Sequence, residues 1–475
     1  MMHYQVAIIG GGPGGYETAI RLKQLNISVI CLEKERLGGV CLHKGCIPTK
    51  SLVNIANLYY EFQQAEQYGL ENYTFPLNFM KISPKIKENI EKLALGIEFI
   101  FHKHAITYEK IKITKIQKKG YYHLFAEQTE YCTAEFVIIA TGSEPKTLSA
   151  LPIDGKKILT SDHIIALPQL PSSLAIVGGG VIGCEFACLF QKLGADVTII
   201  EFLPEIIPTE DDEIAKKLIQ AMRKLGVKIL TKTKVESVKH IESGMGMAPQ
   251  STQQVELELS NGKTLITDYV LVAVGRKPIF DIETEGFYLN QQNEYLVIDD
   301  YCCTNEKKIF AIGDVTGKLM LAHSASKQGL FVAEMINDII NNIPSHIRPI
   351  IFQNIPRCIF TSPEVASCGL TEKQAREQYH EVNIGKFPYQ ANGKAVCSGN
   401  TFGLVKTIFN AQTNVIVGMH IIGYLATELI AQASILINTG STINDLANIV
   451  FAHPTLSECI MESAEDAYNK AIHVI

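Results

Sequence analysis

Two cysteines near the N-terminus are the first candidates for chemistry. Cys41 and Cys46 lie in the segment GGVCLHKGCIPTK, which runs from Gly38 to Lys50. On a helix or a tight turn, this spacing can bring two sulfur atoms within reach of a disulfide bond. In a cytoplasmic chain, a close pair of cysteines is more often catalytic than structural. The alternative is that both are buried thiols without a chemical role.

Thiol–disulfide exchange requires a thiolate, so the chain must also supply a base. His453 in FAHPTLSE is the most distinctive of the 13 histidines, because Pro454 restricts its backbone and a helix is expected to begin at Thr455. Glu458 could orient the imidazole and stabilise its protonated form. Thr455-x-x-Glu458 also has the pattern of a capping box, and the spacing leaves both interpretations open.

Two glycine-rich turns predict two dinucleotide-binding units. Each follows a short apolar strand and precedes a helical run, and the next strand ends in an acidic residue, as in a βαβ unit. The G-x-G-x-x-G pattern lets the backbone approach a pyrophosphate at the helix N-terminus. The spacing from first glycine to acidic residue is the same in both, which favours two true sites over two unrelated turns. The predicted binding residues are Gly10, Gly12, Gly15 and Glu33 in the first unit, and Gly178, Gly180, Gly183 and Glu201 in the second.

The order of the motifs assigns a flavin to the first unit and a nicotinamide to the second. The cysteine pair follows the first unit directly, and a flavin can pass two electrons between a dithiol and a nicotinamide. Asp314, which ends IFAIGD, would then face a ribityl hydroxyl, although in isolation it also suits a turn or a helix cap. Glu201 favours NAD over NADP because a carboxylate repels a 2′-phosphate. The predicted cofactors are therefore FAD and NAD.

Length and composition exclude several other classes of protein. The 475 residues, 47% of them hydrophobic, predict about two to four globular domains. A net charge of −6 provides no basic field for nucleic acid, and the 12 cysteines lack paired zinc-site spacing, so no metal is predicted. No targeting segment is recognisable at the N-terminus, which predicts a cytoplasmic protein. The apolar segment 415–437 contains His420 and Glu428 and is expected to form a strand, a turn and a buried helix rather than a membrane span.

The motifs together resemble the FAD-dependent pyridine nucleotide-disulfide oxidoreductases over almost the whole chain. The resemblance rests on GGGPGGY, GGVCLHKGCIPTK, ATGS, GGGVIGCE, VGRKP, IFAIGD, LAH, GMHIIG and HPTLSE, which occur in the order typical of the family. It implies an α/β fold with two Rossmann-like dinucleotide-binding domains, for FAD and NAD, and a C-terminal α+β dimerisation domain. The expected boundaries are 1–150 for the FAD domain, 151–279 for the NAD domain, 280–349 for a segment completing the FAD domain, and 350–475 for the dimerisation domain.

The resemblance also implies an activity: oxidation of protein-bound dihydrolipoamide to lipoamide through a Cys41–Cys46 disulfide and FAD, with electrons passed to NAD⁺. It makes Cys41 the thiol that faces the substrate and Cys46 the thiol that faces the flavin. His453 would be the base and would act on the disulfide of a partner subunit, so a homodimer is expected. The expected protein partners are lipoylated E2 subunits of 2-oxoacid dehydrogenase complexes, the H protein of the glycine-cleavage system, or both.

Further site residues are implied by matching positions in the family. Lys50 would lie beside flavin N5 and pair with Glu185. Backbone contacts to FAD are expected at Ala105, Gly142, Asp314 and Ala322, and contacts to NAD at Val235 and in the turn 273–276, which contains Gly275. Two positions depart from the family: Phe451 replaces a common histidine, and His104 replaces a common glycine.

Two alternative functions are compatible with these motifs. The nearer one is a sister reductase, similar to glutathione or mercuric reductase, that works from NADPH. Glu201 argues against NADPH, and the tail NKAIHVI lacks the extra cysteine pair of some of these enzymes. The other alternative is a flavin-binding protein with structural cysteines that serves as a redox sensor or a scaffold in a larger complex.

Overall fold

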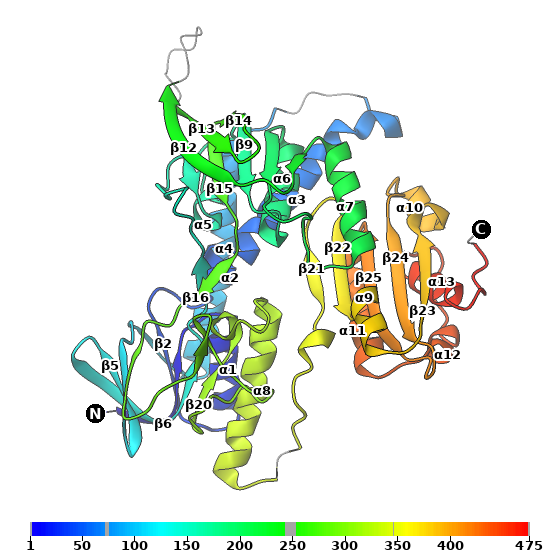
Figure 1. Cartoon of the computed structure of the whole chain (residues 1–475). Helices are drawn as coiled ribbons and strands as arrows, with labels where there is room; N and C mark the ends of the chain where they lie inside the picture. Colours follow the sequence, from blue (N-terminus) through cyan, green and yellow to red (C-terminus); the bar gives the residue numbers. More distant parts are fainter. Residues whose placement is uncertain (1, 72–75, 243–252, 345, 474–475) are drawn as a thin grey trace.

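The computed structural model describes residues 2–71, 76–242, 253–344 and 346–473. The sequence SGMGMAPQSTQQ predicts a polar loop at 243–254, and all but the last two of these residues lie outside the described set. Three sheets with their helices make up most of the fold (Figure 1), and they account for the predicted α/β class. The third sheet lies to one side of the other two.

The first sheet is built on the N-terminal βαβ unit and has the order β17-β4-β5-β6-β1-β2-β3, with β20 paired to β6. Strands β1, β2 and β20 are parallel to β6 or β1. Strands β2 and β20 and the second half of β1 are buried, as expected for the centre of a parallel sheet. The strands are β1 (Met2–Ile9), β2 (Val29–Glu33), β3 (Thr107–Lys110), β4 (Lys115–Lys119), β5 (Tyr121–Ala126), β6 (Thr129–Ile139), β17 (Glu283–Glu285) and β20 (Ile309–Ala311).

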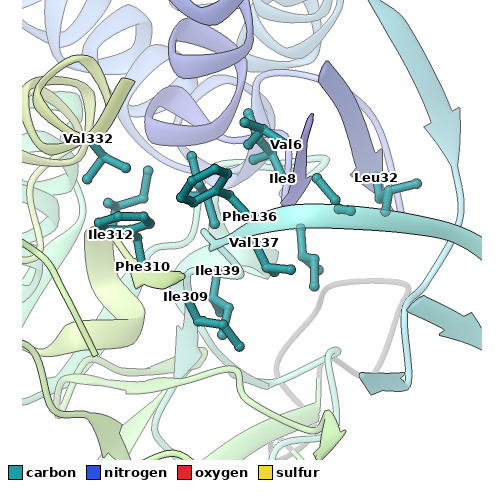
Figure 2. Close-up of a cluster of buried hydrophobic side chains, with 14 of the residues drawn as sticks. Val6, Ile8, Leu32, Phe136, Val137, Ile139, Ile309, Phe310, Ile312 and Val332 are labelled. Carbon is teal, nitrogen blue, oxygen red and sulfur yellow. The ribbon is translucent and has the colours of Figure 1, made fainter. Parts of the chain in front are cut away.

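Helices from distant parts of the chain accompany this sheet, and the first, fourth and eighth helices of the chain bury side chains in its core. The accompanying helices are α1 (Pro13–Gln24), α2 (Gly39–His43), α3 (Cys46–Gln63), α4 (Ile82–Lys103) and α8 (Ala322–Asn341). The sequence predicts a largely helical stretch at 82–99, and α4 confirms it. Figure 2 shows the core, in which Phe136 and Val137 of β6 meet Phe310 of β20 and Val332 of α8. Residues after position 300 therefore complete the N-terminal core.

The second sheet repeats the parallel βαβ arrangement in the order β11-β10-β9-β15-β8. Its strands are β8 (Ile158–Leu159), β9 (Ser173–Val177), β10 (Asp196–Ile200), β11 (Lys228–Leu230) and β15 (Tyr269–Val272), and its helices are α5 (Ser161–Ile164), α6 (Val181–Leu193) and α7 (Asp212–Leu225). Phe186 and Phe190 of α6 share a buried cluster with Leu52 and Ala56 of α3. Helix α3, which follows the N-terminal βαβ unit in the chain, therefore packs against the second sheet's helix α6.

The third sheet is antiparallel throughout, with the order β21-β22-β25-β24-β23. Its strands are β21 (Arg357–Ile359), β22 (Glu364–Gly369), β23 (Val382–Pro388), β24 (Leu404–Asn410) and β25 (Ile416–Gly423). Its helices are α9 (Glu372–Gln378), α10 (Gly393–Cys397), α11 (Ala426–Asn438), α12 (Ile443–Ala447) and α13 (Glu458–Asp466). Segment 415–437 thus forms a strand and a buried helix, as predicted.

Short strands connect these units. They are β7 (Ser143–Pro145) with β16 (Arg276–Pro278), β18 (Gln291–Gln292) with β19 (Tyr295–Leu296), and the antiparallel set β12 (Val235–Glu242), β13 (Gln253–Leu259) and β14 (Thr264–Thr267). The β7–β16 pair joins the chain just after the first sheet to the chain just after the second. Within the described residues, we find no helix with the length and apolar character needed to cross a membrane.

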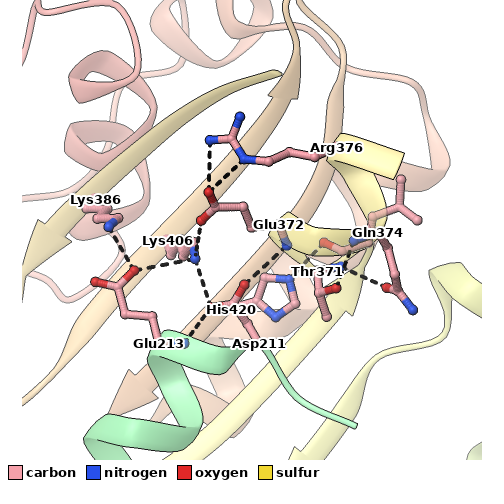
Figure 3. Close-up of polar contacts among 10 residues, drawn as sticks. Asp211, Glu213, Thr371, Glu372, Gln374, Arg376, Lys386, Lys406 and His420 are labelled. Atoms are coloured by element: carbon pink, nitrogen blue, oxygen red, sulfur yellow. Dashed lines mark hydrogen bonds and ion pairs between the residues drawn. The ribbon is translucent and has the colours of Figure 1, made fainter. Parts of the chain in front are cut away.

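A buried group of ion pairs fixes the third sheet to α7 (Figure 3). Lys406 of β24 is 2% exposed, and its ammonium lies 2.8 Å from carboxylate oxygens of both Asp211, which caps α7, and Glu372 of α9. Asp211 is also 2% exposed, so its charge depends on Lys406 for compensation. We call Lys406, Asp211 and Glu372 the Lys406 cluster.

Candidate active site

Cys41 and Cys46 lie together at the junction of two helices. Cys41 belongs to α2, and Cys46 is the first residue of α3. The chain bends at Gly45, where a side chain would press against the carbonyl oxygen of Val40. This bend brings the two sulfur atoms to 2.7 Å, with Cys41 donating to Cys46. The pair can therefore form and break a disulfide bond without a large movement of the backbone.

The environment of the pair favours a thiolate on Cys46. A hydrogen bond from Cys41 and the nearby charge of Lys50 lower the pKa of Cys46 to about 7, against the opposing effect of burial. The same hydrogen bond, together with burial, raises the pKa of Cys41 far above its ordinary range. The position of Cys46 at the N-terminus of α3 also favours negative charge. In the reduced pair, the first proton therefore leaves from Cys46 near neutral pH.

Lys50 stands one turn after Cys46 on α3 and forms an ion pair across to α6. Its ammonium donates to both oxygens of Glu185, at 3.0 and 2.8 Å. Glu185 is buried, and it also accepts a hydrogen bond of 2.9 Å from the backbone amide of Phe360. The predicted contact between Lys50 and Glu185 is thus present, and it includes a residue that the sequence did not indicate.

In the first glycine turn, one glycine packs against the protein backbone and another faces open space. Gly10 has a φ of +112°, and a side chain there would collide with the carbonyl of Ala140. Gly12, at the N-cap of α1, faces open space, and no side chain caps this helix. Glu33 accepts the amide hydrogen of Gly11 at 2.6 Å. Free backbone amides at the helix start and an adjacent carboxylate fit the pyrophosphate and ribose of FAD.

The second glycine turn has the same construction. Gly178 has a φ of +114° and faces the carbonyl of Ala273, while Gly180 faces open space at the N-cap of α6. Glu201 accepts the amide hydrogen of Gly179 at 2.5 Å. These residues fit the corresponding parts of NAD, with Glu201 at the position that contacts the ribose in such turns.

Asp314 is held by a chain of contacts that crosses between the first two units. Its carboxylate accepts a hydrogen bond of 2.6 Å from the Ser143 hydroxyl, which accepts one of 2.7 Å from Nε of Arg276. Arg276 also donates to the backbone carbonyl of Ser143 at 2.7 Å. Asp314 therefore lies in a polar site next to the first sheet, where it can also accept from a bound hydroxyl.

Most of the remaining predicted contacts to FAD and NAD fall on backbone turns. Ala105 has a φ of +48°, whereas the preceding His104 has an ordinary φ of −90°. The left-handed conformation therefore falls on Ala105, and His104 needs no glycine-like freedom. Gly142 has a φ of +75° with open space beside it. The other residues predicted to contact the cofactors are Ala322, which starts α8, Val235, which starts β12, and Gly275, which has a φ of +104°.

His453 and Glu458 form a hydrogen-bonded pair near the start of α13. Nδ1 of His453 lies 2.9 Å from Oε1 of Glu458, and the other oxygen accepts from the backbone amide of Thr455 at 2.8 Å. Burial opposes the charge on Glu458, but these two contacts hold its pKa below the ordinary value. The Glu458 carboxylate therefore makes both of the contacts that the spacing allowed. It orients the His453 imidazole, and it accepts the hydrogen bond from the Thr455 amide.

The expected start of this helix was wrong. Helix α13 begins at Glu458 rather than at Thr455. The hydroxyl of Thr455 donates back to the carbonyl of Ala452, so it does not cap the helix, and residues 456–457 form a turn. Phe451, which replaces a common histidine, packs against the core of the third sheet.

The structure does not bring His453 to the cysteine pair of the same chain. Figure 1 shows α13 on the outer side of the third sheet, well separated from α2 and α3. Among the described residues, the polar partner recorded for His453 is Glu458, and the His453 side chain is 77% exposed. The imidazole is therefore oriented on its Nδ1 side and free to contact another molecule through Nε2.

Sequence reasoning missed two residues that contact the predicted site. Phe360 touches the Lys50–Glu185 pair from the connection between β21 and β22, and Ser143 links Asp314 to Arg276. Ser143 carried a signal, because it belongs to the ATGS motif. Phe360 carried none, because an aromatic residue after an apolar strand is typical of a core.

Comparisons with known proteins agree with this geometry. Residues 4–329 match the family described as pyridine nucleotide-disulphide oxidoreductase, and residues 355–464 match its dimerisation domain. The chain is 36% identical to the dihydrolipoyl dehydrogenase of Zymomonas mobilis and 37% identical to one from Bacillus subtilis, in each case over 99% of both chains.

Solved structures show the same fold. LpdA from Mycobacterium tuberculosis superposes with a TM-score of 0.86 at 24% identity, covering 98% of this chain and 99% of the other. The HOCl-induced flavoprotein disulfide reductase RclA from Escherichia coli superposes with a TM-score of 0.83 at 25% identity, covering 97% and 99%.

Proposed function

The chain belongs to the pyridine nucleotide-disulphide oxidoreductase family, and from this premise we propose that it oxidises protein-bound dihydrolipoamide to lipoamide and reduces NAD⁺. The observation that carries the proposal is the close pair Cys41 and Cys46 at the start of a helix that lies between the two glycine-turn units. Relatives with this printed activity match the chain from end to end. A sister reductase that uses NADPH is less supported, because the same comparison favours dihydrolipoyl dehydrogenases.

In the proposed reaction, a substrate thiolate attacks Cys41 of the oxidised pair. The Cys41–Cys46 bond breaks, and Cys46 leaves as a thiolate, which Lys50 and the helix N-terminus stabilise. The second substrate thiol attacks the substrate sulfur of the mixed disulfide, which releases lipoamide and returns Cys41 as a thiol. The first glycine turn and Glu33 would hold FAD, which would supply the two-electron transfer from the reduced pair to NAD⁺.

We assign the removal of substrate protons to His453, acting on the cysteine pair of a partner subunit. Glu458 holds Nδ1, so that Nε2 can take a proton from a substrate thiol. The dimerisation domain at 355–464 supports a homodimer in which each base is exposed to the other chain. The domain boundaries 1–150, 151–279, 280–349 and 350–475 are part of the same proposal.

A steady-state assay with dihydrolipoamide and NAD⁺ tests the proposal. Cys46→Ser should keep the flavin and lose dihydrolipoamide oxidation. His453→Ala should slow the thiol reaction by roughly 10² to 10⁴-fold, as for loss of a general base, while NADH oxidation by artificial acceptors continues. Much faster turnover of glutathione disulfide with NADPH would contradict the assignment. Unchanged thiol turnover in Cys46→Ser would contradict the redox role of the pair, whereas a complete lack of thiol-dependent turnover in the original protein would favour the sensor or scaffold function.

The lipoyl-bearing partner remains part of the proposal. Lipoylated E2 subunits and the glycine-cleavage H protein present the same dithiol, so the cysteine pair serves either. Copurification from the source cell, with antibody detection of lipoyl groups, would identify which protein binds. The cytoplasmic location stays a prediction, which fractionation of the same cells would test.

A further inference from the structure

One aromatic side chain from the third sheet reaches the ion pair beside the redox cysteines. Phe360 follows β21, and the centre of its ring lies 4.3 Å from the ammonium nitrogen of Lys50. Its backbone amide donates to Glu185 at 2.9 Å. A single residue of the dimerisation domain therefore contacts both members of the Lys50–Glu185 pair, through its ring on one and its amide on the other.

The connection that carries Phe360 is firmly anchored. Ile359, just before it, is 1% exposed within the cluster that α3 and α6 share. Thr361, just after it, is buried and donates to the carbonyl of Pro363. Glu364 accepts two hydrogen bonds from Thr427 at the start of α11, at 3.0 and 2.8 Å. The ring is therefore supplied by a fixed element of the neighbouring domain and not by a free surface loop.

Lys50 needs such support because its ammonium stands between opposed attractions. Glu185 draws it towards α6, while negative charge on Cys46 draws it along α3. Half-buried cations over an aromatic face are stabilised by the ring quadrupole, and the effect grows as water is removed. The Lys50 side chain is 33% exposed, so the ring covers part of a charge that has lost much of its water.

We propose that Phe360 is a positioning residue that holds the Lys50 ammonium where it stabilises the Cys46 thiolate. Its expected effect on turnover rests on the proposed function, but the proposal itself concerns only the charge of the Cys46 sulfur. It also means that the dimerisation domain contributes to the redox site within its own chain, separately from His453.

The test measures the thiolate directly. In a Cys41→Ser background, the rate at which iodoacetamide alkylates Cys46 is followed against pH, with the modified peptide quantified by mass spectrometry. The charged or titratable neighbours of Cys46 then are Lys50 and Glu185. Removing the ring with Phe360→Leu should raise the pKa of Cys46 by about half a unit, because the ammonium is less well held. Phe360→Tyr, which keeps the ring, should restore the original profile.

The double variant with Lys50→Met separates positioning from general damage. Lys50→Met alone should raise the pKa of Cys46, and Phe360→Leu should then add nothing further. Tyr60→Leu is the matched control, because Tyr60 lies on the same helix and its ring faces a different cation, Lys192, at 5.1 Å. This control should leave Cys46 unchanged.

Three results would overturn the proposal: an unchanged Cys46 profile in Phe360→Leu, an equal effect of that change with and without Lys50, or the same shift in Tyr60→Leu. Should Phe360→Leu fail to fold, Phe360→Met removes the ring with a similar volume and carries the same expectations. None of these measurements requires turnover. The expected Cys46 profiles, together with no dihydrolipoamide oxidation by the original protein, would contradict the proposed function alone. Dihydrolipoamide oxidation by the original protein, together with an unchanged Cys46 profile in Phe360→Leu, would contradict the positioning role alone.

Discussion

The two glycine turns of this chain are near copies in their backbone and differ in how their helices are held. In both, the acidic residue ending the second strand accepts two backbone amides. Glu33 accepts from Gly11 and Glu35 at 2.6 and 2.7 Å. Glu201 accepts from Gly179 and Leu203 at 2.5 and 2.6 Å. The construction that faces the dinucleotide is thus the same in both units.

The two units differ at the second residue of the helix that follows each turn. The first turn continues with Gly14, and helix α8 approaches it so closely that a side chain at Gly329 would press against the Gly14 carbonyl. The second turn has Ile182 at the matching place, and α6 packs through larger side chains against α3. The two turns therefore share the G-x-G-x-x-G backbone, while the packing of the helix that follows each turn differs with the neighbouring helix.

The largest effects are expected when a methyl group is added to the first glycine of each turn, which tests whether the two turns bind separate dinucleotides. Gly10→Ala and Gly178→Ala combine a φ near +110° with a collision against a backbone carbonyl, at a cost of about 2 to 6 kcal/mol. Gly10→Ala should lose FAD, as seen in the flavin absorbance after gel filtration. Gly178→Ala should keep FAD and its reduction by dihydrolipoamide but lose NADH formation. Equal loss of flavin in both variants would show that the two sites are not independent.

The second unit has an anchor that the first lacks, the Lys406 cluster. Lys406→Met should destabilise the protein by about 3 to 5 kcal/mol, because the carboxylate of Asp211 would remain buried without its cation. Lys406→Met combined with Asp211→Asn should recover much of that loss, because Asn removes the buried charge and can still cap α7. Urea unfolding followed by circular dichroism measures both. If the single variant unfolds at the same urea concentration as the original protein, the cluster does not stabilise the contact between the domains.

This contrast also explains what the sequence could and could not predict. The glycine patterns, the acidic residues and the cysteine spacing are local, so the backbone around them follows from the residues themselves. The contacts of Gly329 with α1, of Lys406 with Asp211 and of Phe360 with Lys50 join segments far apart in the chain. No periodicity marks such partners, and a buried lysine in a strand carries no sign of its ion pair.

The helix start at Glu458 illustrates the limit of local rules. The pattern at 455–458 resembles a capping box, yet the Thr455 hydroxyl turns back to Ala452 and only the carboxylate half of the box forms. The interaction with His453 was equally compatible with the spacing. Phe451, just before this turn, packs against the core of the third sheet, and such a long-range contact cannot be recognised from the spacing at 455–458.

A smaller effect is expected from the close approach behind the first turn. Gly329→Ala should cost about 1 to 3 kcal/mol, because its methyl group would force α8 away from α1. Gly96→Ala is the matched control, since Gly96 lies in α4 and faces open space. It should be neutral or stabilising by about 0.5 to 1 kcal/mol, as glycine is unfavourable in helices. Thermal unfolding compares the two, and equal stability would contradict the role assigned to the glycine contact.

The smallest expected effects come from neutralising the two matching acids, which should act on different cofactors. Glu201→Gln leaves one amide without a carboxylate acceptor and should cost about 1 kcal/mol, seen as a roughly fivefold rise in KM for NAD⁺ with kcat little changed. It should also narrow the preference for NAD⁺ over NADP⁺, because the repulsion of a 2′-phosphate is lost. Glu33→Gln should weaken FAD retention and leave KM for NAD⁺ unchanged, and the exposed Glu205→Gln should change neither. A rise in KM for NAD⁺ in Glu33→Gln as large as in Glu201→Gln would mean that the two carboxylates do not serve separate dinucleotides.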